Sequence, residues 1–188
     1  YAESNQLLLL YTEKNPSSII AFWQLIRKMG WGYEPLFDSI YNSFSNELKN
    51  EYAGRILNKK LESGKQLSVG KQFPPFQCVN RTNDKFSSAI FLKSKFTLID
   101  FWYSGCAPCR GQFDRLKDLY KQFSNKGFEI VGISVDRDTD KKKWEDIIIN
   151  DKLIWQQYWD MNGKNTKSLS INAFPTNFLI DNTGRIIA

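Results

Sequence analysis

The first third of the chain is patterned as a series of short amphipathic helices. Apolar residues recur three and four positions apart, and Ser, Pro and Gly interrupt the pattern. Helices are predicted before Pro16, between Ser17 and Gly30, over residues 34–44, and between Ser45 and Gly64. The helical spacing predicts one apolar face in the second helix and another in the last. The residues on these faces are Ile19, Phe22, Trp23 and Ile26 in the second helix, and Leu48, Tyr52, Ile56, Leu57 and Leu61 in the last. Residues 1–67 are interpreted as a helical N-terminal segment, with the end of a larger upstream domain as an open alternative, and its aromatic residues as core or docking surface.

The pattern changes between Gly64 and Pro75, where glycines and a Pro pair mark a boundary. Strand-like and helical stretches then alternate: strands at 76–80, 96–103 and 128–136, and helices at 108–125, 140–150 and 165–171. A hairpin is predicted over residues 176–188, turning at Asn182–Gly184. Alternating strands and helices imply parallel crossovers, and the hairpin adds an antiparallel pair. Residues 68–188 are therefore predicted to form an α/β domain, a mixed sheet with helices on both faces.

Charge and hydropathy narrow the possible partners. The chain has 26 basic and 20 acidic residues, a net charge of +6, and no apolar run approaches the length of a membrane span. Lys141–Lys143 follow several acidic residues and are interpreted as a solvated loop and helix start, with a patch for an acidic partner as the alternative. Because no basic stripe interleaves with aromatic residues, we expect no nucleic-acid binding.

The lack of histidine excludes several kinds of site. With 0 His, the chain cannot build Ser-His-Asp or Cys-His catalysis, or a His-ligated metal. Its 3 cysteines, Cys78, Cys106 and Cys109, are too few for a four-thiolate zinc or iron-sulfur centre. Zinc held by the three thiols and a carboxylate stays a minor alternative, and we expect no metal and no cofactor. Cys78 is interpreted as a small buried hydrophobe, a third redox thiol being the alternative.

Cys106 and Cys109 lie three residues apart at the start of the helix predicted after the apolar run 96–103. This spacing brings two cysteines within the Cα separation of roughly 4.4–6.8 Å that a disulfide needs. The apolar stripe of the helix turns Cys109 inward, whereas Cys106 at the N-cap is expected to meet solvent and unpaired backbone N–H groups. Those groups favour a thiolate. Cys106 is thus the candidate nucleophile and Cys109 the resolving thiol.

Asp100 interrupts an otherwise apolar strand six residues before Cys106. Because residues on both faces of this strand are apolar, either orientation places the carboxyl against hydrophobic neighbours. Burial should raise its pKa, so that it serves as an acid or base near neutral pH. A charge at a strand end that points into water is the alternative.

Two motifs carry a family resemblance. "LIDFWYSGCAPCR" is similar to the active-site signature of thioredoxin-fold proteins, and "AFPTNFLID" resembles their cis-proline loop. The lead-in "GKQFPPFQC" and the longer insert between the motifs look most like the TlpA-like thiol-disulfide reductases, which are related to the AhpC/TSA families. Roughly residues 69–188 are covered. The resemblance implies a thioredoxin-like mixed sheet with flanking helices, preceded by the helical segment.

The resemblance also implies roles for individual residues. Cys106 would attack, Cys109 would resolve, and Asp100 would carry the proton. Substrate would contact the residues around the cysteines and the proline loop: Trp102, Gly105, Ala107, Pro108, Phe174 and Pro175. Pro175, with a cis bond to Phe174, would place the Phe174 backbone to pair with an incoming peptide and would keep metal out of the site. Trp102 as plain core is the alternative.

Three features depart from the family pattern. Gly105 stands where many relatives have a bulky aromatic residue, so a more open or flexible rim is expected. Phe174 is larger than the usual Val, Ile or Thr and would narrow the docking site. No closing helix of the fold follows the hairpin before Ala188, so that helix lies further on or the domain is completed otherwise.

The predicted function is reduction of protein disulfides by the Cys106–Cys109 dithiol. Because Ala107 and Pro108 lack the His of strong oxidants, we expect a potential nearer that of thioredoxin, about −270 mV, than that of DsbA, about −120 mV. The partners would be protein disulfides and an upstream thiol-disulfide electron donor. The resemblance implies a bacterial envelope or periplasmic location, free or tethered. A peroxiredoxin-type peroxidase and a non-catalytic thioredoxin-like adaptor are the competing hypotheses.

Overall fold

The computed structural model describes residues 2–188, except for the side chains of Ala2, Ser88 and Leu92. The chain divides into two compact units, residues 1–68 with 169–173, and residues 69–168 with 174–188. Among the described residues, no helix combines the length and the apolar character that crossing a membrane requires.

The first unit is helical, as the hydrophobic pattern predicts. Its helices are α1 (Ala2–Lys14), α2 (Ile19–Lys28), α3 (Leu36–Ser43), α4 (Asn46–Asn50) and α5 (Tyr52–Lys65). Ser18 begins α2 by accepting a hydrogen bond from the Ala21 amide, and Ser45 begins α4 in the same way from Leu48. The core lies between these helices, with Leu25, Ile40, Leu57 and Leu61 almost fully buried.

The predicted inward face of α2 is partly wrong. Phe22 is buried and packs edge to face on Phe44, but Ile19 and Trp23 are 60% and 58% exposed. The helix carries two overlapping apolar stripes, and packing selects the one through Phe22, Leu25 and Met29. Periodicity alone cannot choose between stripes that share a residue.

The single helix predicted after Ser45 is two helices. The chain leaves the helical conformation at Glu51, with φ −63° and ψ 158°, between α4 and α5. Gly54 permits this bend, because a Cβ there would overlap the carbonyl oxygens of Leu48 and Lys49. In α5 the inward residues are Leu57 and Leu61, whereas Tyr52 and Ile56 are exposed.

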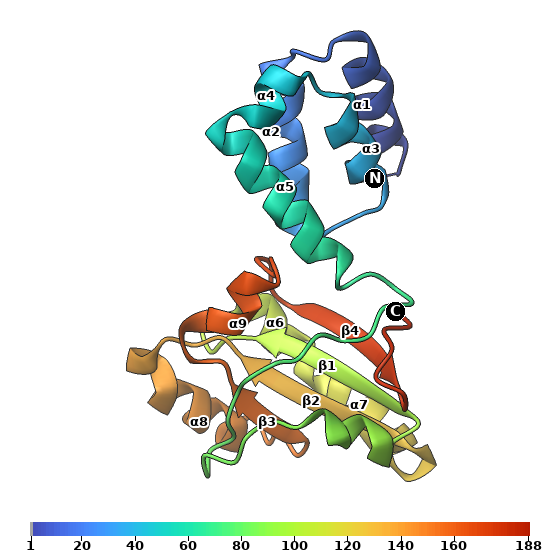
Figure 1. The fold of residues 1–188 in the computed structure, drawn as a ribbon. Helices are drawn as coiled ribbons and strands as arrows, with labels where there is room; N and C mark the ends of the chain where they lie inside the picture. The colour runs from blue at the N-terminus through green and yellow to red at the C-terminus, as the bar shows by residue number, and fades with distance from the viewer. Residues whose placement is uncertain (1) are drawn as a thin grey trace. The chain divides into compact units, whose positions relative to one another are not determined.

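The second unit contains a four-stranded mixed sheet in the order β3-β2-β1-β4 (Figure 1). The strands are β1 (Phe96–Trp102), β2 (Phe128–Ser134), β3 (Gln156–Trp159) and β4 (Thr176–Asp181). β1 pairs in parallel with β2, and β2 with β3, whereas β4 is antiparallel to β1. This sheet confirms the predicted mixed α/β, thioredoxin-like fold class. β1 lies in the interior of the sheet, so its charged residue, Asp100, is enclosed by neighbours.

Helices and an aromatic segment flank the sheet. The helices are α6 (Ala107–Gly111), α7 (Phe113–Phe123), α8 (Lys141–Asn150) and α9 (Lys164–Ser168). Side chains of α7 and α8 share one hydrophobic cluster with the strands, which includes Phe113, Trp144 and Ile130. Phenylalanines of residues 73–91 pack on other strand residues, as Phe76 does on Phe101 with ring centroids 5.5 Å apart.

Three details of the predicted domain change. Residues 156–159, which were not predicted to be a strand, form β3. Residues 76–80 form only isolated bridges at Val79, because Pro74 and Pro75 precede them and the side chain of Asn80 accepts the amides of Thr82 and Asp84, which turns the chain. The helix predicted at 108–125 is interrupted at Gln112, between α6 and α7. The terminal hairpin is present: Asp181 accepts the amides of Thr183 and Arg185 across its turn.

Candidate active site

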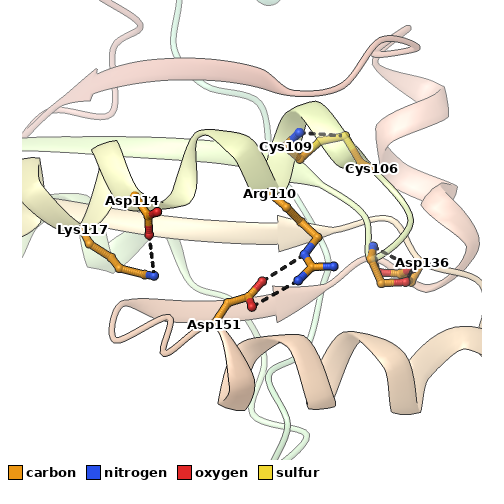
Figure 2. A network of polar contacts seen from close by, with 8 residues as sticks. Cys106, Cys109, Arg110, Asp114, Lys117, Asp136 and Asp151 are labelled. Atoms are coloured by element: carbon orange, nitrogen blue, oxygen red, sulfur yellow. Dashed lines mark hydrogen bonds and ion pairs between the residues drawn. A yellow bond between two sulfur atoms is a disulfide. The ribbon is translucent and has the colours of Figure 1, made fainter.

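The end of β1 and the start of α6 place the two cysteines. After Trp102 the chain turns, with the Cys106 amide donating to the Tyr103 carbonyl at 3.0 Å. Cys106 is the N-cap of α6, and its Sγ accepts a hydrogen bond from the Cys109 amide at 3.1 Å (Figure 2). The two residues form a disulfide with a Cα separation of 5.2 Å. A sulfur in this position faces the N–H groups that a helix start leaves unpaired, which stabilise a thiolate once the disulfide is reduced.

The expected solvent contact of Cys106 is not seen. Cys106 is 2% exposed and Cys109 is fully buried. Because the disulfide ties the Sγ of Cys106 to Cys109, both cysteines lie in the hydrophobic cluster that contains Trp102 and Phe113. In the oxidised form, therefore, both members of the pair are covered.

Trp102 supports the cysteines from the strand side. It is fully buried, packs edge to face on Phe113 with ring centroids 5.2 Å apart, and donates its indole N–H to Gln157 Oε1 at 3.2 Å. The ring therefore lies in the cluster of the disulfide, and its polar atom is satisfied in the interior. The expected substrate contact of Trp102 is not seen, because the side chain is fully buried, and its position agrees with the alternative of a core residue.

Asp136 fixes the loop that leads to Cys106, a role that sequence reasoning missed. This buried residue follows β2. Its carboxylate accepts the Ser104 amide at 2.9 and 3.1 Å, the Ser104 hydroxyl at 2.7 Å and the Ser134 hydroxyl at 2.7 Å. Its carbonyl oxygen accepts the Trp159 indole N–H at 2.9 Å. The ends of three strands are thereby tied together beside the cysteines. An aspartate at the end of the strand predicted over residues 128–136 was the available signal.

Asp100 is fully buried in the middle of the sheet. Burial raises its pKa to about 7, and a hydrogen bond from Gln112 Nε2 to Oδ1, 2.7 Å long, acts in the opposite direction. The burial and the direction of the pKa shift agree with the expectation from the apolar strand. Gln112, which lies at the break between α6 and α7, was not identified from the sequence.

The loop before β4 adds an aromatic contact. The Phe174–Pro175 peptide bond is cis. The Phe174 ring packs edge to face on Tyr103, with centroids 5.7 Å apart, and lies against the cluster that holds Cys106 and Cys109. The structure thus brings Phe174 to the cysteines although more than sixty residues separate them in the sequence.

These features have counterparts in known proteins. A model of the AhpC/TSA family matches residues 69–188. The chain belongs to the AhpC/TSA family. The thiol-disulfide oxidoreductase ResA of Bacillus thuringiensis subsp. konkukian is 27% identical over 122 residues, which are 65% of this chain and 69% of that protein.

Solved structures agree with this assignment. The thiol-disulfide oxidoreductase from Bacteroides fragilis is 36% identical, with a TM-score of 0.56, and the match covers 63% of this chain and 88% of that one. A thioredoxin-like protein from Bacteroides caccae matches 98% of this chain and 71% of its own with a TM-score of 0.74; at 14% identity it shows the fold alone. Together with the Cys106–Cys109 pair, the comparisons confirm a thiol-disulfide oxidoreductase of the TlpA/ResA type.

A cavity lies beside Gly105, the residue that stands where many family members have an aromatic side chain. Gly105 is exposed and, with Tyr103, Arg137 and Ile147 among others, lines a cavity of about 520 Å³. A Cβ at Gly105 would make only ordinary contact with the Tyr103 ring, at 3.4 Å. Ala107 and Pro108, in the first turn of α6, are exposed.

The third cysteine lies away from this chemistry. Cys78 is buried and free, and burial raises the pKa of its thiol far above the ordinary value, with the Asp160 carboxylate adding to the effect. Such a thiol is unreactive as a nucleophile at neutral pH. It agrees with the interpretation of Cys78 as a small buried hydrophobe.

Proposed function

We propose that the chain reduces protein disulfides, with Cys106 as nucleophile and Cys109 as resolving thiol. The observation that carries this assignment is the asymmetry of the pair: the Cys106 Sγ accepts an amide hydrogen bond at the start of α6, whereas Cys109 is fully buried in the hydrophobic cluster. The thiolate form is stabilised only at the first position.

The reaction balances as a two-electron exchange. The Cys106 thiolate attacks one sulfur of the substrate disulfide, so that a mixed disulfide forms and the other substrate sulfur leaves as a thiolate. Cys109 then gives its proton to Asp100, and its thiolate attacks the Cys106 Sγ, which releases the second substrate thiolate. The enzyme ends with the Cys106–Cys109 disulfide, the form seen here. An upstream dithiol donor restores the reduced pair.

Asp100 suits the proton transfer because its pKa is raised to about 7. An acceptor is most effective when its pKa lies near the working pH. Ionised Asp100 can accept the proton of Cys109, and protonated Asp100 can return it in the reverse reaction.

We assign substrate contact to the surface around the pair. Gly105, Ala107 and Pro108 are exposed at the start of α6, and half-buried Phe174 and Pro175 form the neighbouring loop. Trp102 supports the site from inside rather than from the surface, because it is fully buried. The cavity beside Gly105 offers room for a side chain that flanks the substrate cysteine, and Tyr103, whose ring packs on Phe174, forms part of its wall.

A trapping experiment tests the assignment. In Cys109→Ala the mixed disulfide cannot resolve, so protein substrates should accumulate in a covalent complex that dithiothreitol releases. Cys106→Ala is the matched control and should trap none. Recovery of no complex from Cys109→Ala would favour a non-catalytic adaptor. Rapid peroxide consumption by the wild-type protein, lost in Cys106→Ala, would favour a thiol peroxidase.

The reduction potential of the Cys106–Cys109 pair indicates the direction of electron flow and can be measured separately. Ala107 and Pro108 place no cationic side chain between the cysteines, so a reducing protein is expected, with a potential nearer about −270 mV than about −120 mV. Equilibration with glutathione buffers, read by thiol alkylation, measures it. A potential above roughly −180 mV would contradict the reductase direction. We place the protein in the bacterial cell envelope or periplasm, free or tethered, on the likeness to TlpA-type reductases.

A further inference from the structure

The two oxygens of Asp100 differ in their surroundings. Oδ1 accepts the Gln112 amide at 2.7 Å, a length typical of a donor to an ionised carboxylate. Oδ2 is buried and has no hydrogen-bond partner among the described residues. Asp100 is thus half satisfied, with one oxygen held and one free to take a proton.

Gln112 is itself held in one orientation. The Asn177 side-chain amide donates to Gln112 Oε1 at 3.2 Å. If the Gln112 amide rotated by half a turn, its oxygen would face the Asp100 carboxylate and its NH₂ would face the NH₂ of Asn177, so both hydrogen bonds would be lost. Asn177 therefore keeps the donor of Gln112 directed at Asp100.

Three separate elements build this arrangement. Asp100 is on β1, and Asn177 is its direct partner across the antiparallel pair with β4. Gln112 comes from the break between α6 and α7, three residues after Cys109. The interruption of the predicted helix therefore lies at the residue that reaches the buried carboxyl.

Among the residues that the structure describes, no charged side chain contributes to the shift in the pKa of Asp100. On the other flanking strand, β2, the residue opposite Asp100 is Gly132. From the helices, Cys109 is held in the disulfide, and Arg110 pairs at the surface with Asp151 at 3.0 and 3.2 Å (Figure 2). Burial and the Gln112 hydrogen bond are the causes that shift the pKa of Asp100.

We propose that Gln112, held in place by Asn177, is a positioning residue that favours ionised Asp100 and leaves Oδ2 as the oxygen that accepts the Cys109 proton. The inference rests on the proposed function for its catalytic meaning. Its electrostatic part stands on the hydrogen bonds alone, because a donor to a carboxylate stabilises the charged form and an inward-facing amide oxygen would not.

Titration of Asp100 in the oxidised full chain tests the inference directly, because the disulfide removes both thiols from the titration. The carboxyl carbon of Asp100, labelled with ¹³C and identified by its loss in Asp100→Asn, is followed by NMR. Gln112→Leu should raise the pKa of Asp100 by about one unit, since the donor is lost. Gln112→Lys should lower it by a similar amount, since a cation replaces the amide.

Two further variants define the comparison. Asn177→Leu, at an exposed position, should shift the titration upward by less than Gln112→Leu, because Gln112 stays but loses its orientation. Gln122→Leu is the matched control on the exposed face of α7 and should leave the titration unchanged. Shifts of the same sign for Leu and Lys at position 112, or no shift for either, would overturn the inference. If Gln112→Leu and Gln112→Lys fail to fold, an unchanged titration of Asp100 in Asn177→Leu would also overturn the inference.

A kinetic readout separates this inference from the proposed function. The rate of the resolving step, measured with a peptide disulfide in the reduced enzyme, should follow the Asp100 titration, so Gln112→Leu should slow it up to about tenfold at pH 6. A titration that shifts as expected while the rate does not would refute Asp100 as proton acceptor and leave the amide's effect on the carboxyl intact. A titration that does not shift refutes the role of Gln112 whatever the kinetics show.

Discussion

One buried aspartate lies within β1 and another just beyond the end of β2, and their carboxylates have very different hydrogen-bond partners. Asp136, just beyond β2, accepts hydrogen bonds on both carboxylate oxygens, from the Ser104 amide and from the hydroxyls of Ser104 and Ser134. Asp100, within β1, has the single donor Gln112 and one bare oxygen. A satisfied buried carboxylate fixes structure, whereas a half-satisfied one has capacity left for a proton.

The two aspartates therefore have different roles near the cysteines, one structural and one in proton exchange. Asp136 holds the backbone two residues before Cys106, so it sets where the nucleophile stands. Asp100 has a pKa raised to about 7 by burial, so it can exchange a proton at neutral pH. Both roles need burial, and the hydrogen bonds decide which role results.

The largest expected effect is a gain in stability on neutralising Asp100. Its pKa is about 7 in the folded protein and roughly 3.9 in the unfolded chain, so between these values the native state binds more protons and stability falls as pH rises. Asp100→Asn removes this fall and can still accept the Gln112 hydrogen bond. The free energy of unfolding of Asp100→Asn, relative to that of the wild type, should therefore increase by on the order of 4 kcal/mol between pH 4 and pH 8.

Urea unfolding of the oxidised protein at several pH values measures this difference. Asp118→Asn, an exposed carboxylate on α7, is the matched control and should show no such growing advantage. Equal pH dependence in Asp100→Asn and the wild type would mean that Asp100 is not the half-satisfied group described above. The gain should be accompanied by slower resolution of mixed disulfides, since the proton acceptor is lost.

The second effect has the opposite sign. Asp136→Ala leaves the Ser104 amide and two buried hydroxyls without their acceptor, and each unsatisfied buried group costs about 1–3 kcal/mol. A loss of about 3 kcal/mol in the free energy of unfolding is expected. Asp138→Ala, two residues on and exposed, should change the stability by less than about 0.5 kcal/mol. A loss no larger than in this control would remove the contrast with Asp100.

Local patterns predicted the parts of the site that lie close together in the sequence. The apolar run of β1, the helix start at Cys106 and the buried Asp100 all lie within residues 96–109, where periodicity and capping chemistry operate. Strands β1 and β2 and the terminal hairpin were predicted for the same reason, whereas β3 was not predicted and residues 76–80 were wrongly predicted as a strand. Phe174 was connected to the cysteines only through a family resemblance.

The missed features depend on contacts between distant residues. Ser104 and Asp136 are 32 positions apart, and Asn177 and Gln112 are 65 apart, so neither pair leaves a local pattern. The buried face of α2 was misassigned because two apolar stripes share Phe22, and only packing distinguishes them. Cys106 was expected at the surface because the sequence places it at a helix start, but it cannot show how the disulfide draws its side chain into the core.

The smallest expected effect examines the Asp136 cluster one hydrogen bond at a time. Ser104→Ala removes the hydroxyl that donates to Asp136 Oδ1 at 2.7 Å but keeps the backbone amide that donates to both oxygens. Because the carboxylate keeps these donors and that of Ser134, a loss of about 1–2 kcal/mol in the free energy of unfolding is expected, less than for Asp136→Ala. Ser124→Ala, at an exposed position after α7, is the control.

In the double variant Ser104→Ala/Asp136→Ala the two losses in the free energy of unfolding should not add, because both substitutions remove the same hydrogen bond. Full additivity would show that Ser104 and Asp136 stabilise the loop independently, and the account of Asp136 as its anchor would fail.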